Sequence, residues 1–449
     1  MKLWSSMFCA TWFIVGGNCS ANVLADTTMR QSNDDLLIDQ PQSSQATTAT
    51  TSFVPGSCEI GIYRLEERSF VTLTKGDQGF NYTFSEGLIG NTQDANALVE
   101  CGREAVRVFG KQIWHRQKIR ESNVQFESHG VILAGRLLET LDAGKTTPLV
   151  VFAHGSEDSG WIDRAADPYQ MVGRGVSAFV FDKRGTGKSK GEYTQNFPLL
   201  ADDLVAAAHE AKRQASGRFG RFGLLGLSQG GWIAPLASAR AQAQFIGIGF
   251  GLAVDIAEQD VAKVQKELKD RGYGADVLAQ ARLITEVTAK LVKTAYKEGL
   301  DELADIQKRY SKEAWFAAIK GGYSGVYLNI SVEDLRKNGL PMFDRLGVDW
   351  SQNPMQVLVS VKIPQFWAFA EDDRQAPIAT SLERLRKLRT QGHDITIHVF
   401  PQADHGMLNY VQADDLSRKS TRIAAGYYDL MADWAKGQIN VKYGDAYRQ

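Results

Sequence analysis

Hydrophobic and polar positions alternate in short runs between residues 58 and 115, as in EIGIYRL, FVTLT and FNYTF, with Gly, Asp and Asn between the runs. A period of two is typical of strands that bury one face. The pattern predicts a small β-rich module over residues 56–118. Residues 26–55 are rich in Ser, Thr and Gln and poor in apolar side chains, so we expect a disordered linker there.

From residue 119 the pattern changes to continuous apolar runs that alternate with helical stretches. Such runs are typical of buried strands in a mostly parallel sheet with helices on both faces. We expect eight strands, in NVQFES, VILAGRLLE, PLVVFAHG, SAFVFD, FGLLGL, FIGIGF, IPQFWAFA and ITIHVF. The prediction is an α/β fold whose core spans residues 119–251 and 351–449.

Residues 252–350 interrupt this core with helical spacing, since apolar side chains recur three to four positions apart at Val261, Val264 and Leu268. We expect a helical insertion that covers the sheet as a lid. Four aromatic residues of this segment are candidates for an apolar acyl pocket, although the packing of the lid itself is favoured for most of them. They are Trp315, Phe316, Tyr323 and Tyr327.

Composition narrows the set of partners. The chain has 449 residues, of which 43% are hydrophobic and 23% charged, and its 51 basic residues nearly balance 52 acidic ones. Without a basic patch we expect no nucleic-acid partner. Beyond the N-terminus no apolar run approaches the length of about 18 residues that a membrane span needs, so we expect no membrane span.

Residues 1–25 combine an early lysine, a short apolar stretch and the sequence VLA before Asp26. This is the pattern of a signal peptide, cleaved near Ala25, and it predicts export to the periplasm or the extracellular space. The alternatives are a buried N-terminal helix, a retained anchor, or a lipoprotein signal that uses Cys19.

Cysteine usage agrees with export. Outside the leader only Cys58 and Cys101 remain, an even pair suited to an oxidising compartment. We predict a disulfide between them, and two buried thiols are the alternative.

The sequence GTGKS at residues 185–189 looks like the end of a phosphate-binding loop. Asp182 stands where the first glycine of that motif belongs, and Gly191 and Pro198 interrupt the helix that should follow. A nucleotide site is therefore disfavoured. No cofactor is expected, and no metal, because the spacings of His and Cys that hold zinc are missing.

A candidate nucleophile, Ser228, lies in GLSQG between an apolar strand run and a helical run. The flanking Gly226 and Gly230 would let strand and helix pass closely, so that the serine is exposed on a strained turn. The backbone amide of Gln229 would then lie at a helix N-terminus, where it can stabilise a developing oxyanion.

A nucleophilic serine needs a base and an orienting carboxylate. Among seven histidines His405 is favoured, because it follows the last predicted strand at the edge where catalytic groups gather in open α/β folds, and His393 is the alternative. The acid is sought in the loop after the preceding strand, in Glu371, Asp372 or Asp373.

These residues resemble the α/β-hydrolase superfamily, in the branch of esterases, dienelactone hydrolases and prolyl-oligopeptidase-like peptidases. The order Ser228, Asp373, His405 matches the order of that family's triad. AEDDRQAP resembles its G-x-x-D-x-x-V-P with Asp373 as the acid, although Ala370 replaces the leading glycine, which leaves Asp372 as the alternative.

The resemblance also covers FAHGS and DKRGTGKS, which is similar to D-x-R-G-x-G-x-S. It implies that the backbone amide of Ser156 is the second oxyanion donor. Four further residues have expected supporting roles, namely His154, Gly155, Asp182 and Arg184. The H-G-G-G run of the lipase-like branch is missing.

The resulting hypothesis is a serine hydrolase that cleaves small carboxylic esters through an acyl-enzyme. One alternative is an exopeptidase or amidase of the prolyl-oligopeptidase type, although the N-terminal module is too small for the propeller of those enzymes. Another is a non-catalytic binding module on the same fold.

Overall fold

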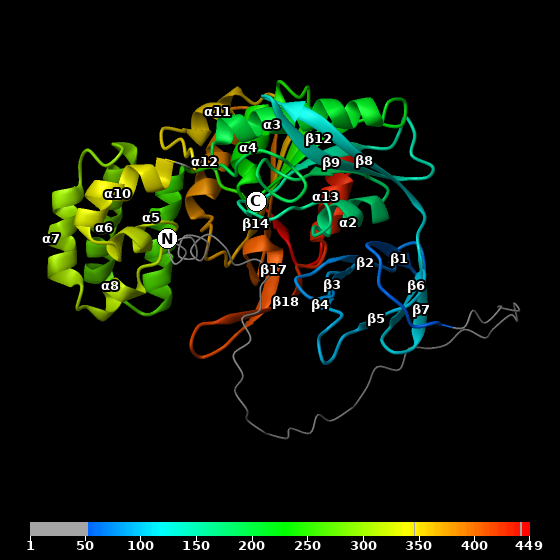
Figure 1. The fold of residues 1–449 in the computed structure, drawn as a ribbon, viewed down its shortest axis with the longest axis horizontal. Coiled ribbons are helices and arrows are strands. Elements are labelled where there is room, and N and C mark those ends of the chain that lie inside the picture. Colours follow the sequence, from blue (N-terminus) through cyan, green and yellow to red (C-terminus); the bar gives the residue numbers. More distant parts are fainter. Residues whose placement is uncertain (1–52, 345, 441) are drawn as a thin grey trace, which may run out of the picture.

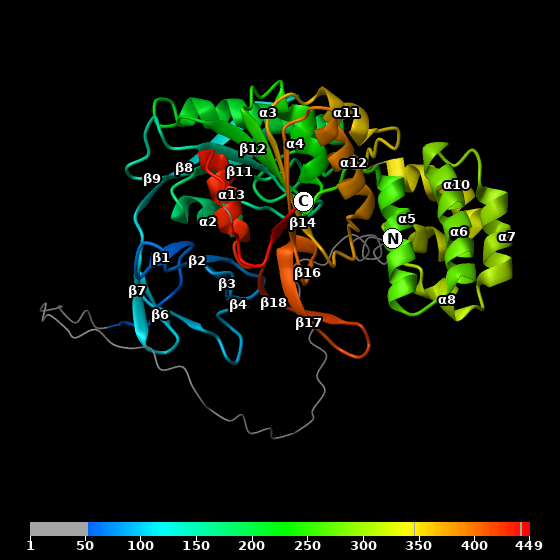
Figure 2. The same ribbon diagram turned by 180° about the vertical axis from the view of Figure 1, so that it is seen from behind.

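The computed structural model describes residues 53–344, 346–440 and 442–449, and Figures 1 and 2 show its ribbon from two sides. The expected signal peptide, with Cys19 and Ala25, lies outside the described residues, as do residues 26–52 of the expected linker. The last linker residues are part of the folded module, because Pro55 forms a β-bridge with Gly102.

The N-terminal module is one antiparallel sheet of seven strands, which lies below the larger domain in Figure 1. Its strands are β1 (Gly61–Arg64), β2 (Phe70–Lys75), β3 (Phe80–Phe84), β4 (Ile89–Asn91), β5 (Val99–Cys101), β6 (Ala105–Val108) and β7 (Gln112–Arg116), in the order β4-β3-β2-β1-β7-β6-β5. Alternate side chains such as Val71, Leu73 and Trp114 form its own small core.

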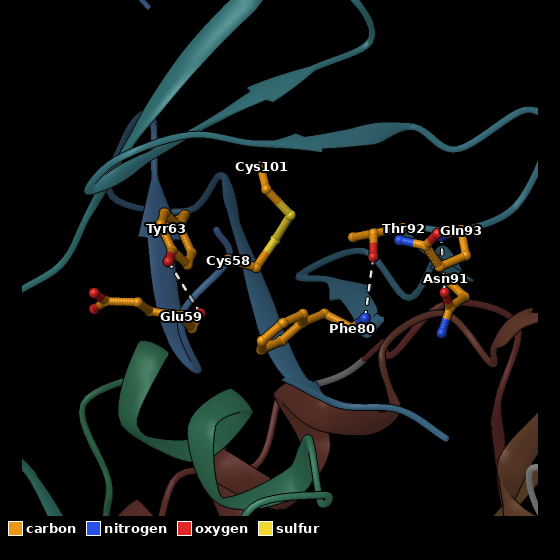
Figure 3. The surroundings of a disulfide bond; sticks show 8 residues. All are labelled: Cys58, Glu59, Tyr63, Phe80, Asn91, Thr92, Gln93 and Cys101. Carbon is orange, nitrogen blue, oxygen red and sulfur yellow. Dashed lines mark hydrogen bonds between the residues drawn. A yellow bond between two sulfur atoms is a disulfide. The ribbon is translucent and has the colours of Figure 1, made fainter. Parts of the chain in front are cut away.

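The predicted disulfide is present in this module (Figure 3). Cys58 and Cys101 are 43 positions apart in the sequence, and their Cα atoms are 4.9 Å apart. Cys58 lies in the segment before β1, and Cys101 lies in β5 at the edge of the sheet, so the bond connects these two parts of the module.

The large domain is built on a nine-stranded sheet. Its strands are β8 (Ile119–Ser128), β9 (Val131–Thr140), β10 (Leu149–Ala153), β11 (Ser177–Phe181), β12 (Phe222–Leu227), β13 (Phe245–Gly249), β14 (Gln365–Ala370), β15 (Ile395–Phe400) and β19 (Tyr447–Arg448). The order is β19-β15-β14-β13-β12-β10-β11-β9-β8, and the strands from β11 to β15 are parallel. The expectation of eight strands misses β19, because a two-residue edge strand has no hydrophobic pattern of its own.

Helices cover both faces of the sheet because its central strands are apolar on both sides. In β10, Leu149 and Val151 face the core under one set of helices, whereas Val150 and Phe152 face the other. The first set is α3 (Phe197–Gln214), α4 (Gly230–Ser238) and α12 (Ala379–Thr390), and the second is α2 (Asp167–Gly173) and α13 (Tyr427–Lys436).

A helical subdomain lies between β13 and β14 and stands to one side of the sheet in both views. It contains α5 (Ile256–Asp270), α6 (Ala275–Lys293), α7 (Leu300–Tyr310), α8 (Ala314–Ala318), α9 (Ser324–Leu328) and α10 (Val332–Asp344), and α11 (Pro354–Ser360) leads back to the sheet. A capping box of Asp255 and Glu258 starts α5, and Val264 and Leu268 join the core on the α3 side. In the described ranges, no helix has the length and apolar character that crossing a bilayer requires.

A small antiparallel sheet that the hydrophobic pattern did not predict follows β15. It contains β16 (Ala403–Asp404), β17 (Leu408–Gln412) and β18 (Arg418–Ile423), and it packs beside β4 of the N-terminal module. Leu88 and Arg422 form a β-bridge across that contact.

Candidate active site

Ser228 lies on a sharp turn between β12 and α4, with φ at 52°, in the left-handed region that side chains disfavour. A Cβ atom at Gly226 would come within 2.2 Å of the Gly230 carbonyl oxygen, and one at Gly230 within 1.9 Å of the Ala153 carbonyl oxygen. Both glycines are therefore required for the close passage of strand and helix. The turn presents the half-buried Ser228 side chain at the carboxyl end of the sheet.

His405 meets Ser228 from the loop after β16. Its Nε2 lies 2.9 Å from Ser228 Oγ, and its Nδ1 lies 2.8 Å from Asp373 Oδ2. Both His405 and Asp373 are buried. When Nδ1–H donates to the carboxylate, Nε2 is left as an acceptor for the serine hydroxyl.

Asp373 lies in the loop after β14 and is fixed by its own backbone. Its Oδ1 accepts hydrogen bonds from the amides of Gln375 at 2.9 Å and Ala376 at 2.6 Å, so that Oδ2 is left to face His405. The neighbouring Asp372 points elsewhere and accepts a hydrogen bond from the Tyr410 hydroxyl.

The alternative base, His393, makes its hydrogen bond away from Ser228. His393 Nδ1 lies 3.2 Å from the carbonyl oxygen of Val361. The structure therefore brings together the favoured residues and not their alternatives.

Two opposed effects set the charge of His405. Burial disfavours the imidazolium, but the charge of Asp373 and its hydrogen bond outweigh burial and raise the pKa of His405 above its usual value. The ring packs edge-on against Phe250, with centroids 5.1 Å apart.

A small cavity of about 20 Å³ lies over Ser228 between the two expected oxyanion donors. It is lined by Ser156, Ser228, Gln229, Trp232, Phe250, Gly251, Leu252, Gln259, Gln375 and Ala376. All these residues are uncharged. The space suits a carbonyl group better than a charged one.

The four aromatic residues suggested for a substrate pocket lie elsewhere. Trp315, Phe316, Tyr323 and Tyr327 are buried in the helical subdomain and pack against one another or their neighbours. Their role is therefore the packing of that subdomain, and the pocket interpretation is wrong. The apolar side chains at Ser228 are those of Trp232, Phe250 and Leu252.

Lys183 lies buried directly behind this cavity. Its Nζ donates to the carbonyl oxygen of Gly155 at 2.5 Å and to Oε1 of Gln229 at 3.4 Å. Burial, only partly opposed by the charge of Glu157, lowers the pKa of Lys183 to about 8. One ammonium group thus contacts both segments that carry the expected oxyanion donors.

Tyr193 and Gln195, in the loop between β11 and α3, complete a ring of hydrogen bonds around Lys183. The Tyr193 hydroxyl donates to the carbonyl oxygen of Ser156, and Gln195 Nε2 donates to that hydroxyl. Gln229 Nε2 donates to Oε1 of Gln195. Side chains from residues 183–195 thus bind the backbone of Gly155 and Ser156 on one side of the cavity and the side chain of Gln229 on the other.

The expected supporting residues hold loops around this ring. Asp182 accepts from the amides of Trp161 at 2.6 Å and Lys188 at 2.8 Å, and a Cβ atom at Gly187 would lie 2.2 Å from its carboxylate. Gly187 of GTGKS thus packs against a carboxylate, which excludes a phosphate in the same place. Arg184 forms a buried ion pair with Asp203 at 2.6 Å rather than with Asp182.

His154 is held within its own loop. Its Nδ1 lies 3.1 Å from Glu157 Oε2, and its ring stacks on Trp161 with centroids 4.9 Å apart. This geometry gives it no contact with Ser228 that a base would need.

Sequence reasoning missed Lys183, Tyr193 and Gln195. The only signal was a lysine between Asp182 and Arg184, directly after a buried strand, where a cation must find buried partners. Tyr193 and Gln195 lie in a loop without any pattern, so their roles depend on tertiary contacts alone.

Comparison with known proteins gives one family. Residues 144–287 match the family model described as serine aminopeptidase, S33, a segment that contains Ser156, the DKRGTGKS loop and Ser228. A comparison with curated proteins gave no match.

Several solved structures are similar to this chain at low identity. An acylaminoacyl peptidase of Pyrococcus horikoshii is 15% identical over 78% of this chain with a TM-score of 0.40, and the aligned part spans only 46% of that protein. An esterase of Pyrococcus furiosus is 15% identical over 64% of this chain and 84% of its own, with a TM-score of 0.39. The α/β hydrolase GrgF from Penicillium is 17% identical over 64% and 91%, with a TM-score of 0.39.

These TM-scores lie below 0.5, so the assignment depends on the matched family segment, the order of the parallel sheet and the contacts of Ser228. The family match covers about a third of the chain, and together with the sheet and the contacts of Ser228 it supports a serine hydrolase of the α/β-hydrolase superfamily.

Proposed function

We propose that this protein hydrolyses carboxylic esters with Ser228 as nucleophile, His405 as general base and Asp373 as the orienting acid. The observation that carries the proposal is the continuous hydrogen-bonded chain from Asp373 through His405 to Ser228, with distances of 2.8 and 2.9 Å. It is the arrangement that activates a serine hydroxyl.

In the acylation step, Ser228 Oγ forms a bond to the ester carbonyl carbon while its proton passes to His405 Nε2. The carbonyl oxygen becomes an oxyanion, which the backbone amides of Ser156 and Gln229 stabilise. The bond to the alkoxy group then breaks, and that oxygen takes the proton from Nε2 as the alcohol departs.

In deacylation, a water molecule gives a proton to His405 Nε2 and attacks the acyl carbon. The new oxyanion occupies the same site, and the bond to Ser228 Oγ then breaks as Oγ takes the proton back. The acid is released and the free enzyme returns, without any cofactor. The helical subdomain supplies Gln259 to the edge of this site, which supports a role as a lid.

Peptide bond cleavage is the second candidate, since the matched family model is described as a serine aminopeptidase. An aminopeptidase must bind the ammonium group of its substrate, for which a carboxylate close to the serine is the suitable partner. The cavity over Ser228 is lined by uncharged residues, which favours esters.

A fluorophosphonate probe tests the proposal. Labelling of the wild-type protein and loss of labelling in Ser228→Ala is the expected result, and labelling that persists in the variant contradicts it. Hydrolysis of p-nitrophenyl esters, compared with that of aminoacyl p-nitroanilides, then separates esterase from peptidase.

We further propose that the protein is exported after cleavage near Ala25. The disulfide of Cys58 and Cys101 supports this proposal, because such bonds persist in oxidising compartments. N-terminal sequencing of the protein from fractionated cells should give Asp26 as the first residue, and an intact Met1 would contradict it.

A further inference from the structure

A second cavity, of about 310 Å³, opens beside the active site and is lined by His405. Gln375 lines both this cavity and the one over Ser228. The two also adjoin along α5, where Gln259 faces the serine cavity and Lys263, one helical turn further on, faces the second cavity. A substrate held at Ser228 can therefore extend into the second cavity.

The position of His405 gives this cavity a place in the proposed reaction. The imidazolium donates its proton to the departing oxygen, so the leaving group must lie beside Nε2. The expected oxyanion donors, Ser156 and Gln229, line the serine cavity. The second cavity is thus on the leaving-group side of the scissile bond.

Most charged side chains of this cavity are cationic, and we call it the cationic cavity. Its cations are Lys263, Arg271, Lys320, Arg374 and Arg418, and its acids are Glu267, Asp270 and Asp404. They come from α5, the loop before α9, the loop after Asp373, and the β16–β18 sheet, so the charge converges from separate elements.

Among the acids that line the cavity, Asp404 directly precedes His405 in the sequence, and its carboxylate is already satisfied. Asp404 accepts from Arg418 Nη1 at 2.6 Å and from the amides of Arg374 and His405 at 3.0 and 2.8 Å. The hydrogen bonds outweigh the effect of burial and lower the pKa of Asp404. The Arg374 guanidinium also lies 3.7 Å from Asp404 Oδ2. Because this one carboxylate faces two guanidinium groups, it compensates their positive charge only in part.

The acids of α5 are also engaged. Glu267 Oε2 accepts from the amides of Lys320 and Gly321 at 3.0 and 2.9 Å. Asp270 pairs with Lys266 at 3.2 Å, and Lys266 itself lies outside the cavity lining. These acids therefore compensate the lining cations only in part.

Several lining cations donate to neutral acceptors. Lys320 Nζ donates to the carbonyl oxygen of Ala317 at 3.0 Å, and Arg271 Nη1 donates to that of Glu267 at 3.0 Å. The Lys263 ammonium lies 3.9 Å from Glu267 Oε1, at the limit of an ion pair. A carbonyl oxygen satisfies a donor but does not neutralise its charge.

We propose that the cationic cavity binds an anionic group, such as a carboxylate, on the leaving group of the substrate. This inference rests on the proposed ester hydrolysis and narrows its substrate class. Ammonium and guanidinium groups that converge on a half-enclosed cavity bind a carboxylate through charge-assisted hydrogen bonds and are less screened than on an open surface.

Two ester pairs test the proposal and distinguish the possible positions of the anion. 4-Acetoxybenzoate and 4-acetoxybenzamide share an acyl group and differ in the charge of the leaving group. We expect kcat/KM to be higher for the benzoate by about ten-fold at low ionic strength, and the ratio to fall as salt is added. 4-Nitrophenyl esters of 4-carboxybenzoic and 4-carbamoylbenzoic acid carry the same difference on the acyl side and should show no such preference.

Equal kcat/KM for the two acetoxy esters overturns the proposal. So does a preference that appears only when the charge is on the acyl group.

Charge reversal locates the effect. Lys263→Glu and Lys320→Glu should each reduce the preference for the anionic leaving group. Lys269→Glu is the matched control, because Lys269 is exposed on the same helix but does not line the cavity, and its variant should keep the wild-type ratio. An equal reduction in the control would mean that net charge alone is responsible, and would refute the site.

Binding to Ser228→Ala separates this inference from the proposed activity. Calorimetry should show that 4-hydroxybenzoate binds to this variant and that 4-hydroxybenzamide binds at least several-fold more weakly. If the wild type hydrolyses neither acetoxy ester, the proposed function fails, whereas the binding preference still supports the cavity. Equal binding, or none, of both phenols overturns the cavity itself.

Discussion

The ammonium nitrogen of Lys183 lies 2.5 Å from the carbonyl oxygen of Gly155, in the peptide group that carries the Ser156 amide. The Lys183 side chain is only 3% exposed, so this charge acts in a medium of low polarity. The contact fixes the orientation of the peptide group and places a positive charge behind the proposed oxyanion site.

Replacement of this lysine should therefore slow catalysis. We expect Lys183→Met to lower kcat for p-nitrophenyl acetate by about ten- to a hundred-fold with little change in KM, because an oxyanion exists only in the transition state and the intermediate. Lys188→Met is the matched control, since Lys188 is exposed in the same loop and pairs with Asp163. Equal effects of the two substitutions would contradict the prediction.

The pH dependence of Lys183 provides a signature that a purely structural role would not give. Because burial lowers the pKa of Lys183 from 10.5 to about 8, the charge is lost as pH rises through 8 and kcat should fall. The unfolded chain keeps that proton up to about 10.5, so the contribution of this group to stability rises over the same range. Wild-type kcat and unfolding free energy, each compared with those of Lys183→Met, should thus change in opposite directions above pH 8.

Asp373 and its neighbour should differ in their effect on activity. Asp373→Asn removes the charge that orients His405 and should lower kcat by about 10⁴-fold. Asp372→Asn changes the adjacent carboxylate, which contacts Tyr410, and kcat for a neutral ester should stay within about three-fold of the wild-type value. Steady-state kinetics with p-nitrophenyl acetate measures both values of kcat. Comparable losses in the two variants would contradict the assignment of Asp373 as the orienting acid.

The acidic limb of the pH–rate profile should report His405. Protonation of Nε2 removes the general base, so kcat/KM should fall as pH drops through the pKa of His405, which lies above the usual 6.5. Because the charge of Asp373 raises this pKa, the residual activity of Asp373→Asn should have its acidic limb at a lower pH. An unmoved or higher limb in the variant would show that another group titrates.

The disulfide should stabilise the N-terminal module. A loop of 43 residues implies a contribution of roughly 4 kcal/mol to the free energy of unfolding from lost chain entropy. The double variant Cys58→Ala/Cys101→Ala should therefore unfold at lower temperature, as followed by calorimetry, while kcat of the folded protein is unchanged because both cysteines lie outside the active site. Wild type treated with reductant is the control and should behave in the same way.

The sequence alone determined the layered architecture and predicted the residues that meet at the candidate site. The apolar runs from PLVVFA to ITIHVF are strands because a parallel strand is buried on both faces, which leaves a local hydrophobic pattern. GLSQG identified Ser228 for a similar reason, since a strained turn between strand and helix requires glycine at fixed positions. Such constraints act within a few residues and are visible in sequence.

Tertiary structure decided which of the neighbouring candidates meet. Asp372 and Asp373 are equivalent in sequence, but the amides of Gln375 and Ala376 bind one of them and turn it toward His405. The partners of Lys183 are likewise set by the packing of separate loops, since Gln229 lies 46 positions away in the chain. A side chain's orientation, its burial and its charged partners depend on contacts between distant segments, and no local pattern of residues contains them.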